Sequence, residues 1–252
     1  MQTVGWLVCL VAVTLKGNDA ETRADDARRT PIVQAVEKCR PAIVALKVAK
    51  SDGESPERTG TGVIVDRRGY IVTSRHLIAG AAGIRVILAD RTVFAARMVA
   101  GEPDTDLAIL RIDALRPLPT LTPASGRDLL VGERVIAIGH PYGYDYTVST
   151  GIISGLARSI TMPTGAVLSD VIQFDAPINP GNSGGPLLNV HGAWIGLSAA
   201  VREGAQGIAF ALNIETVKGM LRRHLDPDGS DNPEDPRPLV SPASALWSAM
   251  ER

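Results

Sequence analysis

The sequence predicts an all-β protein, and three observations support that prediction. Short β-branched apolar segments recur through the middle of the chain, each bounded by Gly, Pro, Asp or Asn. The 252 residues include 25 Gly and 17 Pro, which is typical of many tight turns between short elements. Strands do not alternate with long amphipathic helices, which disfavours a doubly wound α/β sheet. No repeat of about 20 to 50 residues is visible, which argues against propellers and solenoids.

The predicted elements form one domain at residues 30–225. A short helix opens the domain, because Pro31 stands at its start and apolar side chains follow at helical spacing. A second helix at 214–225 closes it, and its last turn is basic, as the helix dipole favours. The strands between them are predicted, in order, at residues 43–49, 59–66, 69–78, 84–90, 92–100, 107–113, 134–141, 147–154, 171–178, 186–200 and 206–213.

Both ends of the chain are predicted to lie outside this domain. Residues 1–29 hold an uncharged apolar run at 4–15, which is too short to span a bilayer and suits the apolar part of a secretory signal. We therefore expect export to the periplasm or cell envelope, or secretion, with membrane anchoring if the run is not cleaved. Residues 226–252 begin with an Asp- and Pro-rich stretch, so we expect a disordered tail.

Composition excludes several classes of protein. With 26 basic and 27 acidic side chains, the net charge is -1, which gives no electrostatic reason to expect nucleic acid as a partner. The two cysteines are too few for a disulfide framework, so the hydrophobic core must hold the fold.

The strongest local signal is the segment NPGNSGGPL around Ser183. Glycines on both sides of a serine let the backbone turn tightly, expose the hydroxyl and direct backbone N–H groups to one spot. Ser183 is therefore the candidate nucleophile. An ordinary Gly-rich turn is the alternative that this segment leaves open when taken alone.

A serine nucleophile needs a base, and the chain offers 4 histidines. His76 follows a predicted strand, at a position where a strand end presents its side chain to a cleft. His140 stands in a turn before a proline, His191 at a hairpin tip and His224 on an exposed helix end. These positions favour His76 as the base.

The base works best when a buried carboxylate orients it and stabilises the imidazolium. Asp106 meets that demand because it stands directly before the apolar strand LAIL. Asp104, two residues earlier, is the solvated competitor.

The chain order His76, Asp106, Ser183 discriminates between folds. GNSGG also satisfies the G-x-S-x-G pattern of α/β-hydrolases, but that fold requires a helix after the serine and the order Ser, Asp, His. A strand-like segment follows Ser183 instead. The observed order on an all-β background predicts the chymotrypsin-like double six-stranded β-barrel, here with short terminal helices.

Ordered blocks across residues 30–225 carry a family resemblance. The blocks are GTGVIVDRRGYIVTSRHLI, DTDLAILRID, VGERVIAIGHPYGYDYTVSTGIISGLAR, QFDAPINPGNSGGPLLNVHGAWIGL and GIAFALNIETV. In order and spacing they resemble the protease domain of HtrA/DegP-like trypsin-fold serine endopeptidases. The resemblance implies that His76 is the general base, Asp106 its orienting carboxylate and Ser183 the nucleophile. It also implies an oxyanion hole from the N–H groups of Gly181 and Ser183, and no metal or organic cofactor.

The resemblance also implies a primary specificity pocket, lined by Ile178 and by the strand residues Leu197, Ala199, Ala200 and Val201. Apolar walls without an acidic base would favour small or medium aliphatic side chains. Plain core packing is the alternative for Leu197.

Two features depart from the family pattern. The stretch after residue 225 is too short for the PDZ domains that usually follow the protease, and no aromatic residue lies between Trp6 and Tyr70, where family trimers tend to be held together. We therefore do not carry over trimer formation. The resemblance implies an endopeptidase acting on unfolded or damaged polypeptides. A chaperone-like or resting-inactive binding protein with the same fold is the alternative.

Overall fold

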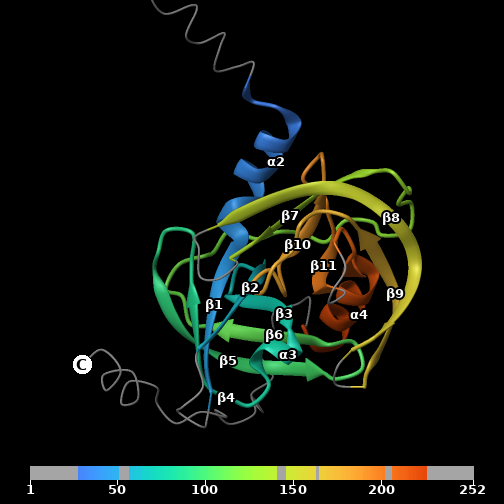
Figure 1. Ribbon diagram of the computed structural model, residues 1–252. Coiled ribbons are helices and arrows are strands. Elements are labelled where there is room, and N and C mark those ends of the chain that lie inside the picture. The colour runs from blue at the N-terminus through green and yellow to red at the C-terminus, as the bar shows by residue number, and fades with distance from the viewer. Residues whose placement is uncertain (1–27, 51–56, 141–145, 163–164, 202–205, 226–252) are drawn as a thin grey trace, which may run out of the picture.

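The computed structural model describes residues 28–50, 57–140, 146–162, 165–201 and 206–225. Apart from residues 28 and 29, the predicted leader and tail lie outside these ranges. Within them, two closed antiparallel β-barrels stand side by side, the first in blue to green and the second in yellow-green to orange (Figure 1). The predicted double six-stranded barrel is confirmed.

The first barrel has the strand order β1-β2-β3-β6-β5-β4 and closes through the pairing of β1 with β4. Its strands are β1 (Ile43–Lys50), β2 (Arg58–Asp66), β3 (Tyr70–Ser74), β4 (Ala81–Ile87), β5 (Val93–Glu102) and β6 (Leu107–Ile112).

The second barrel has the order β10-β11-β12-β9-β8-β7 and closes through the pairing of β10 with β7. Its strands are β7 (Arg134–Gly139), β8 (Thr147–Thr161), β9 (Val167–Phe174), β10 (Pro186–Asn189), β11 (Trp194–Val201) and β12 (Ala209–Asn213). The segment predicted at 186–200 is thus a hairpin of β10 and β11, and β8 runs seven residues beyond its predicted end.

The segment predicted as one strand at 69–78 divides into β3 and the short helix α3 (Arg75–Ile78). The cause is a long-range contact. The backbone N–H of Arg75 donates to the main-chain oxygen of Asp106, and that of His76 donates to its carboxylate, each at 2.8 Å. Asp106 thereby satisfies N–H groups that open the helix.

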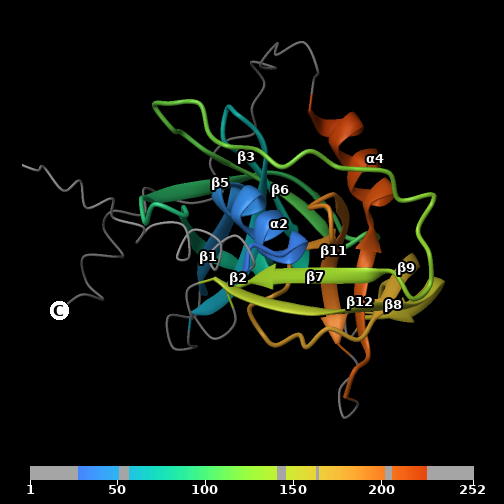
Figure 2. The same ribbon diagram turned by 90° about the horizontal axis from the view of Figure 1, so that it is seen from above.

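Helices close both ends of the described domain. Helix α2 (Pro31–Cys39) is capped by Thr30, whose Oγ1 accepts from Val33 N at 3.4 Å, and a turn of 3-10 helix at Arg40–Ala42 leads into β1. Helix α4 (Ile214–His224) is capped by Asn213 and packs against β11 and β12 (Figure 2).

Three hydrophobic clusters form the core. One fills the first barrel around residues such as Leu110, and another fills the second barrel around Phe174. The third joins the two barrels and contains the fully buried Trp194 and Leu197 from one side and Val72 and Ile109 from the other. The shared cluster fixes the two barrels against each other, which is what positions the site.

No helix within the described ranges combines the length and apolarity needed to cross a membrane.

Candidate active site

The first barrel brings His76 and Asp106 together. Nδ1 of His76 lies 2.5 Å from Oδ2 of Asp106, although the two residues are 30 positions apart in the chain. Asp106 is 6% exposed, so water competes weakly for its carboxylate. Because a carboxylate only accepts, Nδ1 donates in this contact, which leaves the ring's lone pair on Nε2.

Asp106 is held in an uncommon backbone conformation, with φ at 53°. Left-handed backbone is rare for residues other than glycine, and it persists where surrounding bonds determine it. Here the bonds to α3 described above do so, together with the N–H of Asp106, which donates to Pro103 O at 3.3 Å. The turn aims the carboxylate at both the ring and the backbone of His76.

Arg58, at the start of β2, supports the other end of α3. Its guanidinium donates to the main-chain oxygen of His76 at 3.0 Å and to that of Ala79 at 2.5 Å. These are carbonyls at the end of a short helix, where cations are favourable. Sequence reasoning missed Arg58, because the carbonyls that it bonds belong to the connection between β3 and β4.

The second barrel supplies the nucleophile loop at residues 179–185, in the turn before β10. Its glycines are required by close approach. A Cβ on Gly184 would lie 2.2 Å from Thr61 O and 3.0 Å from Ser74 N, and a Cβ on Gly185 would lie 2.2 Å from Ile138 O. The loop therefore sits against β2 and the end of β3, and the nearest of these contacts is two residues before His76 in the chain.

The loop leaves two donors and one hydroxyl unengaged. None of the described residues accepts a hydrogen bond from the N–H of Gly181 or Ser183, and Ser183 Oγ makes none within the same ranges. Gly181 has φ at 107°, a conformation that favours glycine. Two free N–H groups beside a half-buried hydroxyl can stabilise an oxyanion that forms there.

The competing residues lie elsewhere. Asp104 is exposed, and His191 is exposed in the turn between β10 and β11. His224 contacts Glu102 at the end of α4. His140 is buried at the end of β7, where its backbone N–H donates to Thr61 Oγ1 at 3.0 Å.

The residues expected to line a specificity pocket differ in burial. Ile178 is half-buried and packs against the core cluster of the second barrel. Leu197 is fully buried and Ala199 is 3% exposed, and both belong to the cluster shared by the two barrels. The side chains of Ala200 and Val201 lie outside the described part of the structure.

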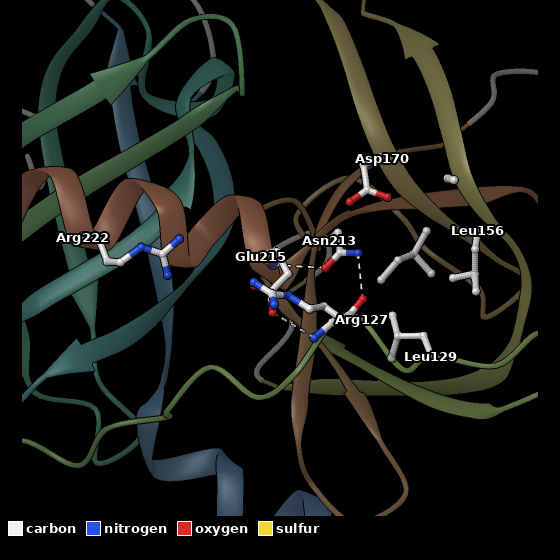
Figure 3. Close-up of a pocket in the computed structure, with 10 residues that line it drawn as sticks. Arg127, Leu129, Leu156, Asp170, Asn213, Glu215 and Arg222 are labelled. Atoms are coloured by element: carbon white, nitrogen blue, oxygen red, sulfur yellow. Dashed lines mark hydrogen bonds and ion pairs between the residues drawn. The ribbon is translucent and has the colours of Figure 1, made fainter.

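A cavity of about 560 Å³ lies on the second barrel (Figure 3). Leu156 of β8, Asp170 of β9 and Glu215 of α4 contribute to its walls, with Arg127 beside Glu215. Neither His76 nor Ser183 lines it, so the cavity is separate from the candidate active site.

Comparison with known proteins agrees with this geometry. A family model described as "Trypsin-like peptidase domain" matches residues 60–197. The chain is 48% identical over 176 residues to "Protease Do-like 1, chloroplastic" of Arabidopsis thaliana, which covers 67% of this chain and 39% of the relative. It is 38% identical over 176 residues to "Probable periplasmic serine endoprotease DegP-like" of Hahella chejuensis, covering 69% of this chain and 37% of the relative.

Solved structures give the same picture. "HtrA-type protease AlgW with tripeptide" has a TM-score of 0.70 and 36% identity, covering 76% of this chain and 62% of that chain. The serine endoprotease from Yersinia pestis has a TM-score of 0.66 and 34% identity, covering 76% of this chain and 65% of that chain. The chain thus spans well under half of the two curated relatives and about two thirds of the two structures.

Proposed function

This chain belongs to the trypsin-like peptidase family and is homologous to the HtrA and DegP-like serine proteases, and we propose that it is a serine endopeptidase. The proposed triad is His76 as general base, Asp106 as its orienting carboxylate and Ser183 as nucleophile. The observation that carries this assignment is the 2.5 Å contact of His76 with Asp106 beside the Ser183 loop. The N–H groups of Gly181 and Ser183 form the proposed oxyanion hole.

The reaction follows from these roles. His76 Nε2 takes the proton of Ser183 Oγ as the oxygen attacks a peptide carbonyl, and the imidazolium is stabilised by Asp106. The negative charge on the carbonyl oxygen is held by the two N–H groups. His76 then gives its proton to the leaving amine, and water hydrolyses the acyl-enzyme by the same route. The side chains named here supply every proton transfer.

We propose polypeptides as substrates, cleaved after small aliphatic residues. Ile178 and the strand from Leu197 to Val201 carry no charge, so a basic side chain would find no partner among them. Unfolded or damaged proteins are the proposed physiological class, because the relatives are proteases of the HtrA and DegP-like type.

We also propose that the protein works outside the cytoplasm. The names of relatives place some in the periplasm and others in chloroplasts. The apolar run at 4–15 is consistent with export, either cleaved or kept as a membrane anchor. Mass determination of the mature N-terminus, purified from its native source, tests this: a start beyond residue 15 supports cleavage, and a start at Met1 supports an anchor.

The endopeptidase proposal is tested by incubating wild type and Ser183→Ala with β-casein and with a fluorophosphonate probe. Wild type should cleave casein and take up the probe, and the variant should do neither. Wild type that does neither, while suppressing aggregation of unfolded casein, would favour the chaperone-like alternative instead.

A further inference from the structure

We propose that Thr61 is a positioning residue that clamps the nucleophile loop so that its N–H groups face the reacting carbonyl. The inference rests on the proposed function and concerns the same site. Thr61 belongs to the first barrel, on β2, whereas the loop belongs to the second. It touches no substrate, so its effect on the reaction passes through Gly181 and Ser183.

Thr61 bonds the loop at both ends of the proposed oxyanion hole. Its Oγ1 donates to the main-chain oxygen of Gly181 at 2.7 Å, and its backbone N–H donates to that of Ser183 at 3.0 Å. These carbonyls belong to the peptide planes that carry the N–H groups of Asn182 and Gly184, so the plane that carries the Ser183 N–H lies between two held planes. A single residue therefore fixes two carbonyls that flank the hole.

The hydroxyl of Thr61 is itself held. Oγ1 accepts from the N–H of His140 at 3.0 Å, and because a hydroxyl has one proton, its donation is committed to Gly181. Thr73 Oγ1 donates to the carbonyl of Thr61 at 2.7 Å. Bonds in such a chain polarise and strengthen one another in a buried setting.

Gly181 needs an external clamp, because the N–H groups of Gly184 and Gly185 donate to Ser198 O and Asn182 O, whereas none of the described residues accepts from the Gly181 N–H. Glycine populates both positive and negative φ, so the peptide planes on either side of Gly181 can rotate at low cost. The free N–H groups give no restraint of their own. The bond from Thr61 fixes the plane that follows Gly181 and thereby limits the rotations about Gly181 that would turn its N–H away from the oxyanion.

The environment of Thr61 leaves no substitute for its hydroxyl. The residue has no exposed surface, and it stands between Gly60 and Gly62, which lie in close contact with Leu77 and Ile71. Loss of the hydroxyl would remove its bond to the Gly181 carbonyl and its bond from the His140 N–H at once.

The test compares three variants with wild type. Thr61→Val removes the hydroxyl at nearly constant volume, and Thr61→Ser retains the hydroxyl. Thr59→Val is the matched control, because Thr59 lies half-buried on the same strand, two residues before Thr61, and no described residue of the nucleophile loop bonds to it. Removing one oxyanion-hole donor costs about 100 to 1000-fold in kcat, so loosening one should cost about 10 to 100-fold.

We expect Thr61→Val to lower kcat by that factor while KM stays within about threefold of wild type. The affinity for a peptide boronic acid inhibitor should fall by the same factor as kcat. The boronate forms a B–O bond to Ser183 Oγ, whose proton passes to His76, and so presents a tetrahedral oxygen to the hole. Thr61→Ser and Thr59→Val should stay within about threefold of wild type in kcat and in boronate affinity.

The outcomes separate this proposal from the proposed function. An active wild type with an equally active, folded Thr61→Val overturns the clamp and leaves the endopeptidase standing. Equal losses in Thr61→Val and Thr59→Val also overturn it, because general loosening of β2 would explain both. A Thr61→Val that fails to fold leaves Thr61→Ser to decide: a loss of more than tenfold there contradicts the proposal. An inactive wild type contradicts the proposed function instead.

Discussion

The two barrels contribute to the candidate site in different ways. The first holds His76 and Asp106 through bonds within itself: the ring contact, the carboxylate on the His76 N–H and the guanidinium of Arg58 on α3. The second supplies Ser183 on a glycine-rich loop whose outward bonds to the first barrel come from Thr61. The proposed acid–base pair is thus built into one barrel, whereas the position of the proposed nucleophile depends on how the two barrels meet.

The largest effect should come from the triad itself. Ser183→Ala and His76→Ala should each lower kcat about 10⁶-fold, and Asp106→Asn about 10⁴-fold, because the asparagine leaves the imidazole in the wrong tautomer. Asp104→Asn is the control and should be active, since its side chain is exposed. The measurement is casein cleavage at matched enzyme concentration. A strong loss in Asp104→Asn with little loss in Asp106→Asn would reverse the assignment.

The contact between the barrels is tested by two core substitutions. Trp194→Ala, in the shared cluster, should cost about 3 to 5 kcal/mol in the free energy of unfolding, and Leu110→Ala, inside the first barrel, about 2 to 5 kcal/mol. Only Trp194→Ala should also lower kcat of the folded fraction, because only that site lies between the barrels. Urea denaturation and kcat per titrated active site measure both. Equal kcat losses would mean that the barrel contact has no special role.

Substitution of Arg58 tests whether bonds within the first barrel hold His76 in place. Arg58→Gln should lower kcat by about 10 to 100-fold, since α3 would carry His76 slightly out of place. Arg67→Gln, on an exposed side chain near the end of β2, is the control. Steady-state kinetics with a peptide substrate measure the change. If both variants match wild type, the position of His76 rests on Asp106 alone.

The smallest effect concerns a contact between α4 and the turn before Asp106. Burial acts to raise the pKa of Glu102, but hydrogen bonds from Arg223, Thr105 and His224 outweigh it and hold the pKa below its ordinary value. The ionised Glu102 carboxylate therefore stabilises the folded protein above the unfolded-state pKa of about 4.3. This stabilisation disappears as pH falls through the lower pKa of the folded state.

Glu102→Gln should accordingly lower the free energy of unfolding by about 1 kcal/mol near pH 7, with the difference closing in acid. Denaturation curves measured from about pH 3 to 7 give this difference, because that range brackets the ordinary carboxyl pKa of about 4.3. Glu37→Gln, whose side chain is 54% exposed, should show a smaller difference throughout. If the difference in the free energy of unfolding between wild type and Glu102→Gln grows as pH falls, the pKa of Glu102 is not lowered in the folded state.

Sequence reasoning reached the fold and the proposed triad through local signals. Ser183 stands in a glycine-rich segment, and Asp106 stands directly before an apolar strand. The strand after Ser183 is confirmed as β10, which excludes the α/β-hydrolase elbow. Such features are readable because each depends on neighbours in the chain.

What sequence reasoning missed depends on distant contacts. Helix α3 forms because Asp106, about 30 residues later, bonds its first N–H groups. Thr61 donates a hydrogen bond to Gly181, which lies 120 residues later in the chain, and the sequence around a single threonine does not indicate such a partner. The one available signal is that Thr61 stands between two glycines in a buried strand, a place where another backbone approaches closely.

The central claim is that Ser183 is the nucleophile activated by His76 from the other barrel. The most direct test is to label wild type with a fluorophosphonate and locate the adduct by peptide mass spectrometry, with His76→Ala labelled in parallel. We expect a single adduct on Ser183 that forms at least about 1000-fold more slowly in His76→Ala. An adduct on another residue, or labelling of Ser183 at an equal rate in both proteins, would contradict the account.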